Sequence, residues 1–150
     1  MTHTYTQIIY HLVWSTKERQ ALILPEFQEQ LFQYIGGTLR ALGGTCLEIG
    51  GMPDHIHILA STQPCSAIAN VVRDVKVGAT KWVKDNIPRA RGFAWQEGYG
   101  AFTVDRGNLD PVVTYIKNQA QHHAQQSFRD EFLALLNRYK VDYEERYLWK

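Results

Sequence analysis

The sequence has few cysteines, no long apolar run and almost no net charge. Its two cysteines, Cys46 and Cys65, form no C-x-x-C pair, so we expect reduced thiols in a cytoplasmic protein. No stretch of about 20 apolar residues occurs, and no membrane span is expected. The opening MTHTYTQIIYHLVW lacks the basic start and continuous apolar core of a signal peptide. A net charge of +1 gives no global sign of nucleic-acid binding.

The chain has enough apolar residues for one folded domain. Its 150 residues are 45% hydrophobic, and no repeat, low-complexity tract or linker rich in proline and serine divides them. We therefore expect residues 1–150 to form a single domain with a substantial core.

Two histidines stand one residue apart in the stretch MPDHIHIL, residues 52–59. The apolar residues around them predict a strand, on which His55 and His57 point to the same face. Ile56 and Ile58 then point to the opposite face, toward a core. Neutral imidazole is a common metal ligand, so the pair suits a divalent cation. Two hydrogen-bonded histidines on a half-buried sheet would give the same pattern, and these residues alone do not separate the two interpretations.

Hydrophobic periodicity and turn residues predict the order of the remaining elements. β-branched and aromatic runs mark the strands, whereas apolar residues at helical spacing mark the helices. The expected elements are, in order, strand 6–14, helix 25–42, strands 45–50 and 55–61, helix 66–86, a fourth strand at 93–96 with 101–104 as a further segment of it, and helices at 110–126 and 129–139.

The order β-α-β-β-α-β predicts an α+β fold of the ferredoxin-like type, followed by additional C-terminal helices. In this topology two helices cover one face of a four-stranded antiparallel sheet, and the first and third strands are central neighbours. The histidine pair would then lie in the middle of the sheet, on the face without helices.

The helix expected at 110–126 presents two polar side chains together. Tyr115 and Gln119 are four residues apart, on a face distinct from the apolar stripe of this helix. If this face lies over the open sheet, His55, His57 and Gln119 can converge on one metal ion. Tyr115 would then stand beside that ion as a hydroxyl nucleophile.

The same helix also has a plainer interpretation. Tyr115 could merely cover the edge of the sheet. We interpret His122 and His123, which follow on the same helix, as solvated residues.

Four segments of the chain resemble the HUH tyrosine transposases: YHLVWSTKER, PDHIHIL, WQEGYGAFTV and TYIKNQAQHH. The histidine pair alone is a weak motif. A strand with H-x-H followed by Tyr-x-x-x-Gln on a late helix, in a chain of 150 residues, is a strong one. These enzymes are small transposases of insertion sequences that move as single-stranded DNA, and domesticated relatives act at repetitive extragenic palindromes. The resemblance extends over nearly the whole chain.

The resemblance implies a metal-dependent enzyme that cleaves and rejoins single-stranded DNA at hairpin-bearing ends through a 5′-phosphotyrosine intermediate. Tyr115 corresponds to the nucleophile, and His55, His57 and Gln119 correspond to the ligands of Mg²⁺ or Mn²⁺. Histidine ligands favour Mn²⁺, and two histidines with one amide leave positions open for substrate oxygen. Asp54 would orient His55 or serve as a plain turn residue. Members typically work as homodimers, in which the tyrosine helix can serve the partner's site.

Positive charge is concentrated between residues 73 and 91, where six basic residues stand against two acidic ones. We interpret this segment as a track for DNA phosphates, with a solvated helix face as the plain alternative. The candidate DNA-binding residues, which include two after the first strand, are Lys17, Arg19, Arg73, Lys76, Lys81, Lys84, Arg89 and Arg91.

A non-catalytic nucleic-acid-binding module like the RNA-recognition motif is the main rival, because it has the same order of elements. The segment GYGAFTV, residues 98–104, also resembles its aromatic signature. However, Glu97 replaces the expected basic residue, and the signature belongs on the third strand, which here carries histidines. Tyr99 is a second candidate nucleophile, without a ligand at helical spacing. A metal-dependent hydrolase ranks last, since Asp54 is the only acidic residue adjacent to the histidine pair.

Overall fold

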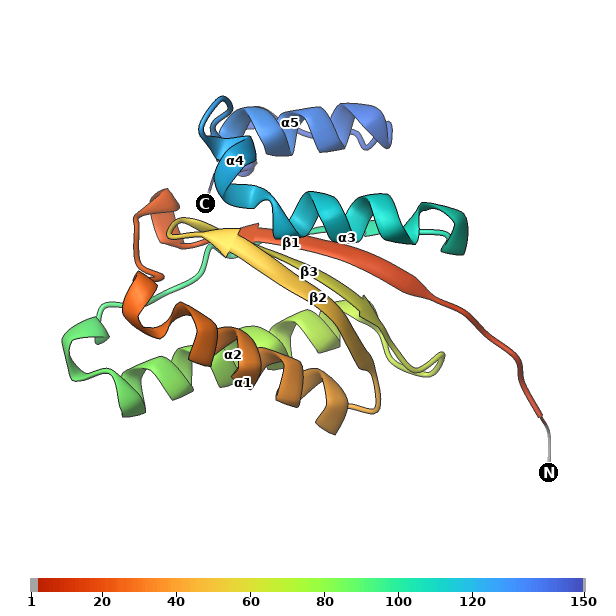
Figure 1. Cartoon of the computed structure of the whole chain (residues 1–150), viewed down its shortest axis with the longest axis horizontal. Helices are drawn as coiled ribbons and strands as arrows, with labels where there is room; N and C mark the ends of the chain where they lie inside the picture. Colours follow the sequence, from red (N-terminus) through yellow and green to blue (C-terminus); the bar gives the residue numbers. More distant parts are fainter. Residues whose placement is uncertain (1–2, 150) are drawn as a thin grey trace.

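The computed structural model describes residues 3–149 and has one four-stranded antiparallel sheet with helices on both faces (Figure 1). The strands lie in the order β2-β3-β1-β4, so β1 and β3 are the central pair. This order confirms the predicted ferredoxin-like arrangement. The strands are β1 (Ile9–Ser15), β2 (Thr45–Met52), β3 (His55–Ser61) and β4 (Gly100–Thr103).

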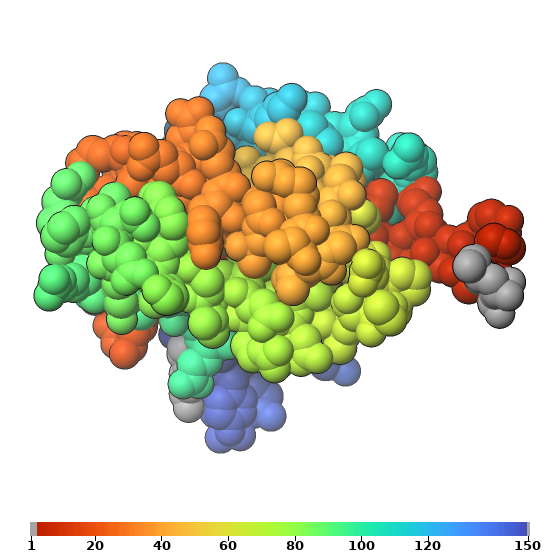
Figure 2. Space-filling view, turned by 90° about the horizontal axis from the view of Figure 1, so that it is seen from below, coloured from red at the N-terminus to blue at the C-terminus, as the bar shows by residue number. Residues whose placement is uncertain are grey.

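Two long helices, α1 (Pro25–Ala41) and α2 (Ile68–Asn86), cover one face of the sheet (Figure 1). Seen from that side, they form most of the molecular surface (Figure 2). Alternate residues of the central strands, such as Leu12 and Ile58, are fully buried against apolar residues of both helices. This interdigitated layer is the main core, and burial of its apolar area is the largest stabilising contribution to the fold.

Three further helices cover the opposite face: α3 (Leu109–Lys117), α4 (Gln119–His123) and α5 (Phe128–Arg138). They bury two smaller apolar clusters against the sheet, one around Ile9 and Leu59 and one around Val13. Along this face of β1, His11 lies between Ile9 and Val13. Short 3₁₀ turns complete the chain at Lys17–Arg19 (η1), Pro88–Ala90 (η2), Arg106–Asn108 (η3) and Glu145–Tyr147 (η4).

Two predicted elements differ from the structure. The fourth strand is Gly100–Thr103, whereas the segment 93–96 contributes only an isolated bridge between Trp95 and Thr16. The helix expected at 110–126 is divided at Asn118, whose backbone adopts φ −97° and ψ 25°. Asparagine is a weaker helix former than alanine or leucine, which favours a break at this residue, although the Asn118 side chain makes no capping hydrogen bond. None of the helices within residues 3–149 is long and apolar enough to cross a membrane.

Candidate metal and nucleophile site

The two histidines of β3 lie on the sheet face that α3, α4 and α5 cover. The side chains of His55 and His57 are 0% exposed, and Ile56 and Ile58 point into the main core as the strand period predicts. The ring of His55 stacks on Phe128 of α5, with 4.4 Å between ring centroids. The strand therefore presents both imidazoles inside the protein and away from the main core.

Each of these histidines has a partner at its Nδ1 atom. Nδ1 of His55 lies 2.7 Å from Oδ1 of Asp54, and Nδ1 of His57 lies 2.8 Å from Nε2 of His11. Burial, followed by the charge of His57, lowers the pKa of His11 to about 3, so the His11 ring stays neutral and keeps a nitrogen lone pair. Contacts at Nδ1 fix the ring orientation, and they direct Nε2 of both histidines into the space below α4 and α5.

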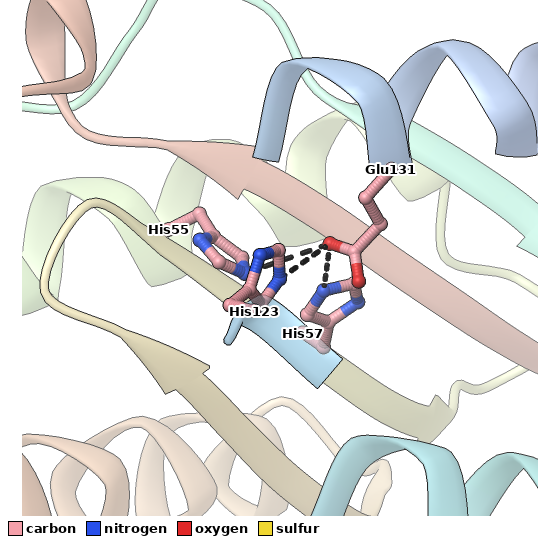
Figure 3. A group of neighbouring side chains, drawn as sticks. All are labelled: His55, His57, His123 and Glu131. Carbon is pink, nitrogen blue, oxygen red and sulfur yellow. Dashed lines mark hydrogen bonds and ion pairs between the residues drawn. The ribbon is translucent and has the colours of Figure 1, made fainter. Parts of the chain in front are cut away.

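Glu131 of α5 occupies the centre of this space (Figure 3). Its side chain is 1% exposed, and its Oε1 lies 2.8 Å from Nε2 of His57 and 3.5 Å from Nε2 of His55. Burial raises the pKa of Glu131. The hydrogen bond and charge of His57, with smaller contributions from Tyr115 and His55, lower it by more than burial raises it, so the pKa lies below its ordinary range. Glu131 is therefore a buried carboxylate surrounded by imidazoles.

Two residues of α4 complete the cluster. Oε1 of Gln119 lies 2.8 Å from Nε2 of His55, as expected for a residue predicted to converge on the histidine pair. Nε2 of His123 lies 3.0 Å from Oε1 of Gln119 and 3.2 Å from Oε1 of Glu131. The possible metal ligands His55, His57, His123 and Glu131 offer atoms that all lie within 4.8 Å of one another.

The interpretation of His123 as a solvated residue is wrong. Its side chain is only 7% exposed, because it stands four residues after Gln119 on α4 and therefore shares the face of Gln119 that lies toward the sheet. His122 is also not simply solvated: it is 30% exposed, and its Nε2 lies 3.2 Å from the Tyr115 hydroxyl.

Tyr115 lies at the edge of the same cluster. Its hydroxyl donates a hydrogen bond to Oε2 of Glu131, and its ring centroid is 5.8 Å from that of His57. Burial, followed by the hydrogen bond and charge of Glu131, raises the pKa of Tyr115 above its ordinary value. The phenol therefore keeps its proton in the free chain. Tyr99, the second candidate, is instead packed against the main core on the other side of the sheet.

Sequence reasoning missed His11 and Glu131, although each carries a signal. His11 alternates with Ile9 and Val13 on one strand, so it shares their face. Glu131 falls between Phe128 and Phe132 on an amphipathic helix, which makes it a carboxylate on a buried face. A charged residue at such a position is seldom buried unless it is paired.

The candidate DNA-binding residues of α2 lie on the opposite face of the sheet from this cluster. On α2, Arg73 pairs with Asp74 and Lys81 with Asp85, whereas Arg89, which follows in η2, pairs with Glu26 of α1. The remaining α2 lysines differ: Lys84 is exposed, and Lys76 donates hydrogen bonds to the carbonyls of residues 96, 97 and 98. Burial lowers the pKa of Lys76 to about 8. Arg91 is exposed after η2, and Lys17 and Arg19 lie in η1, where the Arg19 guanidinium stacks 4.5 Å above the Trp149 ring.

A comparison with protein families identifies the family to which the chain belongs. Residues 4–119 match the family model for IS200-like transposases, so the chain is a member of that family, whose activity is the transposition of DNA. This membership confirms the resemblance to the HUH tyrosine transposases that the sequence motifs indicated.

The individual relatives share only a low sequence identity with this chain. The ISDra2 transposase TnpA of Deinococcus radiodurans is 26% identical over 118 residues, which cover 75% of this chain and 84% of that protein. A crystal structure from Deinococcus radiodurans R1, assigned as a transposase, is 24% identical, with a TM-score of 0.62 over 79% of this chain and 96% of that one. A REP-associated tyrosine transposase bound to a REP hairpin is 14% identical, with a TM-score of 0.60 over 82% and 74%. These two structures show the shared fold.

Proposed function

We propose that the chain cleaves and rejoins single-stranded DNA by transesterification, with Tyr115 as the nucleophile, and that residues 1–150 act as one domain. One observation carries this proposal. The Tyr115 hydroxyl and the Nε2 atom of His57 both contact the carboxylate of Glu131, so a nucleophile and a buried histidine pair share one site. These groups are 16 and 74 residues from Glu131 in sequence, and only the fold brings them together.

The donor set fits a divalent metal ion. His55, His57 and His123 offer imidazole nitrogens, Glu131 offers a carboxylate and Gln119 an amide oxygen, and all of these side chains are buried or nearly so. Nitrogen-rich donors with one carboxylate suit Mn²⁺ better than Mg²⁺, and both metals bind phosphate oxygens. A bound ion would offset the negative charge that develops on the phosphate oxygens.

The side chains of the chain itself supply the remaining steps. The phenolic oxygen of Tyr115 forms a bond to phosphorus, the bond between phosphorus and the 3′ oxygen breaks, and the 3′ oxygen takes up a proton. Oε2 of Glu131 is the atom placed to accept the phenolic proton, because it already receives the hydrogen bond of the Tyr115 hydroxyl. The resulting 5′-phosphotyrosine retains the energy of the phosphodiester, so a second 3′-hydroxyl can attack it and rejoin the strand.

Three side chains of the site, those of His55, His57 and Gln119, are held in orientation by hydrogen bonds. Asp54 and His11 hold the Nδ1 atoms of His55 and His57, which keeps the Nε2 atoms directed at the site. Asp54 is suited to this contact, since the hydrogen bond and charge of His55 outweigh the effect of burial and hold the pKa of Asp54 below its ordinary value. Gln119 is held in turn by Glu131, whose Oε2 accepts a hydrogen bond from the Gln119 amide at 3.2 Å.

The DNA partner is proposed to carry a hairpin, by analogy with the REP-associated relative whose structure contains one. The basic residues of η1, α2 and the segment after α2 remain our candidates for its phosphate backbone. A homodimer is the assembly proposed from the family, and Tyr115 of each chain is already seated among its own histidines.

A denaturing gel tests this function. Labelled single-stranded hairpin DNA from the ends of the genetic element that encodes the protein is incubated with the wild-type chain and Mn²⁺ or Mg²⁺. We expect a metal-dependent band of DNA linked to protein, which Tyr115→Phe abolishes and the matched control Tyr99→Phe retains. Tight binding without a covalent band, across both element ends and both metals, would instead favour a non-catalytic binding module.

A further inference from the structure

A cavity of about 330 Å³ opens directly beside the nucleophile. Its lining includes Tyr115, His122 and Glu131 of the candidate site, together with Ala134 and Arg138 from α5. A phosphate that is to react with the Tyr115 hydroxyl has to approach that oxygen, and this cavity adjoins it. The volume lies within the range of about 300–1,000 Å³ that is usual for small-molecule pockets.

A second cavity, of about 430 Å³, continues the first along α3 and α5. The two share Asn108, Val112, Arg138 and Tyr139 in their linings, so they form one groove that runs away from Tyr115. A continuous groove that begins at a nucleophile is suited to a chain-like substrate.

We propose that this groove, here called the α3–α5 groove, binds the unpaired nucleotide next to the scissile phosphate of the DNA strand. This inference rests on the proposed function, because it assigns the substrate contacts of the same site. The groove differs in place from the basic residues of α2, which lie on the opposite face of the sheet.

The side chains that line the groove match the chemistry of a nucleotide. Asn108 and Gln126 carry amides that can donate to and accept from the edge of a base, and Val112 and Leu135 provide apolar walls. The Tyr139 ring stacks on Phe102 at 4.8 Å, which holds it in place as a flat aromatic wall.

Arg138 supplies the charge. It is exposed at the end of α5, and it forms no ion pair with any residue in the described range 3–149. Its guanidinium lies 5.8 Å from the centre of the Tyr139 ring, where it is available to a backbone phosphate of a nucleotide in the groove. Asp105 in the outer part of the lining is the opposing charge, and it accepts hydrogen bonds from Asn108.

The α5 wall lies outside the part of the chain that matches the family model, which ends at residue 119. The α3 wall, with Asn108 and Val112, lies within that part, whereas Arg138 and Tyr139 lie beyond it.

Two pairs of variants test the groove. Ala134→Trp fills it and Arg138→Gln removes its charge, whereas the controls Asn137→Trp and Lys140→Gln make the same changes at exposed residues outside the lining. Binding is measured without metal, in EDTA, by fluorescence anisotropy of a labelled single-stranded oligonucleotide of mixed sequence, in a Tyr115→Phe background. We expect each groove variant to weaken binding roughly tenfold, which for Arg138→Gln is the size of one charged hydrogen bond, and each control to leave binding unchanged.

A second measurement places the nucleotide. Once the gel has located the cleaved phosphate, an abasic nucleotide is introduced beside it, or several positions away as a control. The adjacent abasic site should slow adduct formation by the wild type and have no further effect on Ala134→Trp, since both changes remove the same contact. If the wild type forms adducts but the groove variants behave like their controls, the proposed role of the groove is wrong and the proposed function still stands. A wild type without adducts would overturn the proposed function itself.

Discussion

The two faces of the sheet are buried by opposite kinds of chemistry. Toward α1 and α2, the central strands present residues such as Leu12 and Ile58 to a continuous apolar layer. Toward α3, α4 and α5, the alternate residues His55 and His57 meet a buried carboxylate, and His11 contacts the ring of His57. In β3, Ile56 and Ile58 therefore pack in the main core, whereas His55 and His57 belong to the candidate site.

Hydrogen bonding separates the two faces further. On the site face, the buried polar groups form hydrogen bonds with one another. Glu131, for example, makes hydrogen bonds to His57, Tyr115 and Gln119. Among residues 3–149, the buried side-chain polar atoms without a hydrogen-bond partner are Nε1 of Trp14 and of Trp95, both in the apolar layer. The comparison shows that a polar cluster can be as fully buried as a core when its members satisfy one another.

Adjacent residues of β3 provide the sharpest contrast between the faces. Ile58→Ala removes a fully buried side chain and should lower the free energy of unfolding by about 2–5 kcal/mol, because it leaves a cavity in the main core. His57→Asn should instead reduce metal-dependent adduct formation at least about 100-fold, since it removes a proposed ligand. Chemical denaturation and the denaturing gel measure the two effects. Similar losses of both properties in both variants would mean that the faces are not separable.

Removal of the partner behind His57 tests how the site is oriented. His11→Ala should weaken Mn²⁺ binding by about 10–100-fold, because nothing then holds Nδ1 of His57. His11→Gln should restore a large part of the affinity, since an amide oxygen can accept the same hydrogen bond. Electron paramagnetic resonance of free Mn²⁺ gives the affinity without any DNA present. Equal affinities for His11→Gln and His11→Ala would leave only a packing role for His11.

A glycine on β2 connects the sheet to the nucleophile. A Cβ atom at Gly50 would overlap the carbonyl oxygen of Ile116, so Gly50→Ala must displace α3, the helix that carries Tyr115. We expect a loss of about 1–3 kcal/mol in stability, together with slower adduct formation. Gly92→Ala is the matched control, because a Cβ atom there has nothing within 4 Å. Normal adduct formation by Gly50→Ala would show that the placement of α3 is not critical.

Mixing two inactive variants should produce the smallest effect. Tyr115→Phe and His57→Asn are combined in equal amounts and tested on the same gel. We expect no adduct above that of each variant alone, because the Tyr115 hydroxyl contacts Glu131 of its own chain and α3 is closely packed on its own β2. Restored adduct formation would show that the tyrosine helix serves a partner's site, as in the dimers that the family resemblance implies.

Much of the fold could be predicted from local patterns. β3 has the predicted bounds 55–61, because alternating apolar residues and flanking turns define it without reference to the rest of the chain. The helix at 110–126 was not predicted correctly, since its break changes the backbone only at Asn118 and leaves helical hydrogen bonds in place on both sides. The apolar stripe is continuous across that residue, so periodicity alone gives no sign of a break.

The candidate site was predictable where its residues lie near one another in sequence. His55, His57, Tyr115 and Gln119 follow short-range rules of strand and helix geometry, and the structure brings them together. Glu131 comes from a separate helix whose approach angle depends on the apolar clusters beneath it, and no spacing rule connects it to the histidines. The position of Glu131 in the site is therefore determined by the tertiary packing of α5 and not by local sequence.

The break at Asn118 and the loop before α5 have a consequence for how the chain acquires activity. Every site group that does not come from β1, β3 or the turn before β3 lies between residues 115 and 131, on segments that dock on the sheet from above (Figure 1). A chain in which these segments are not docked has no phenol and no carboxylate beside its histidines. The proposed reactivity therefore depends on the docking of the last part of the chain, and the sheet alone does not provide it.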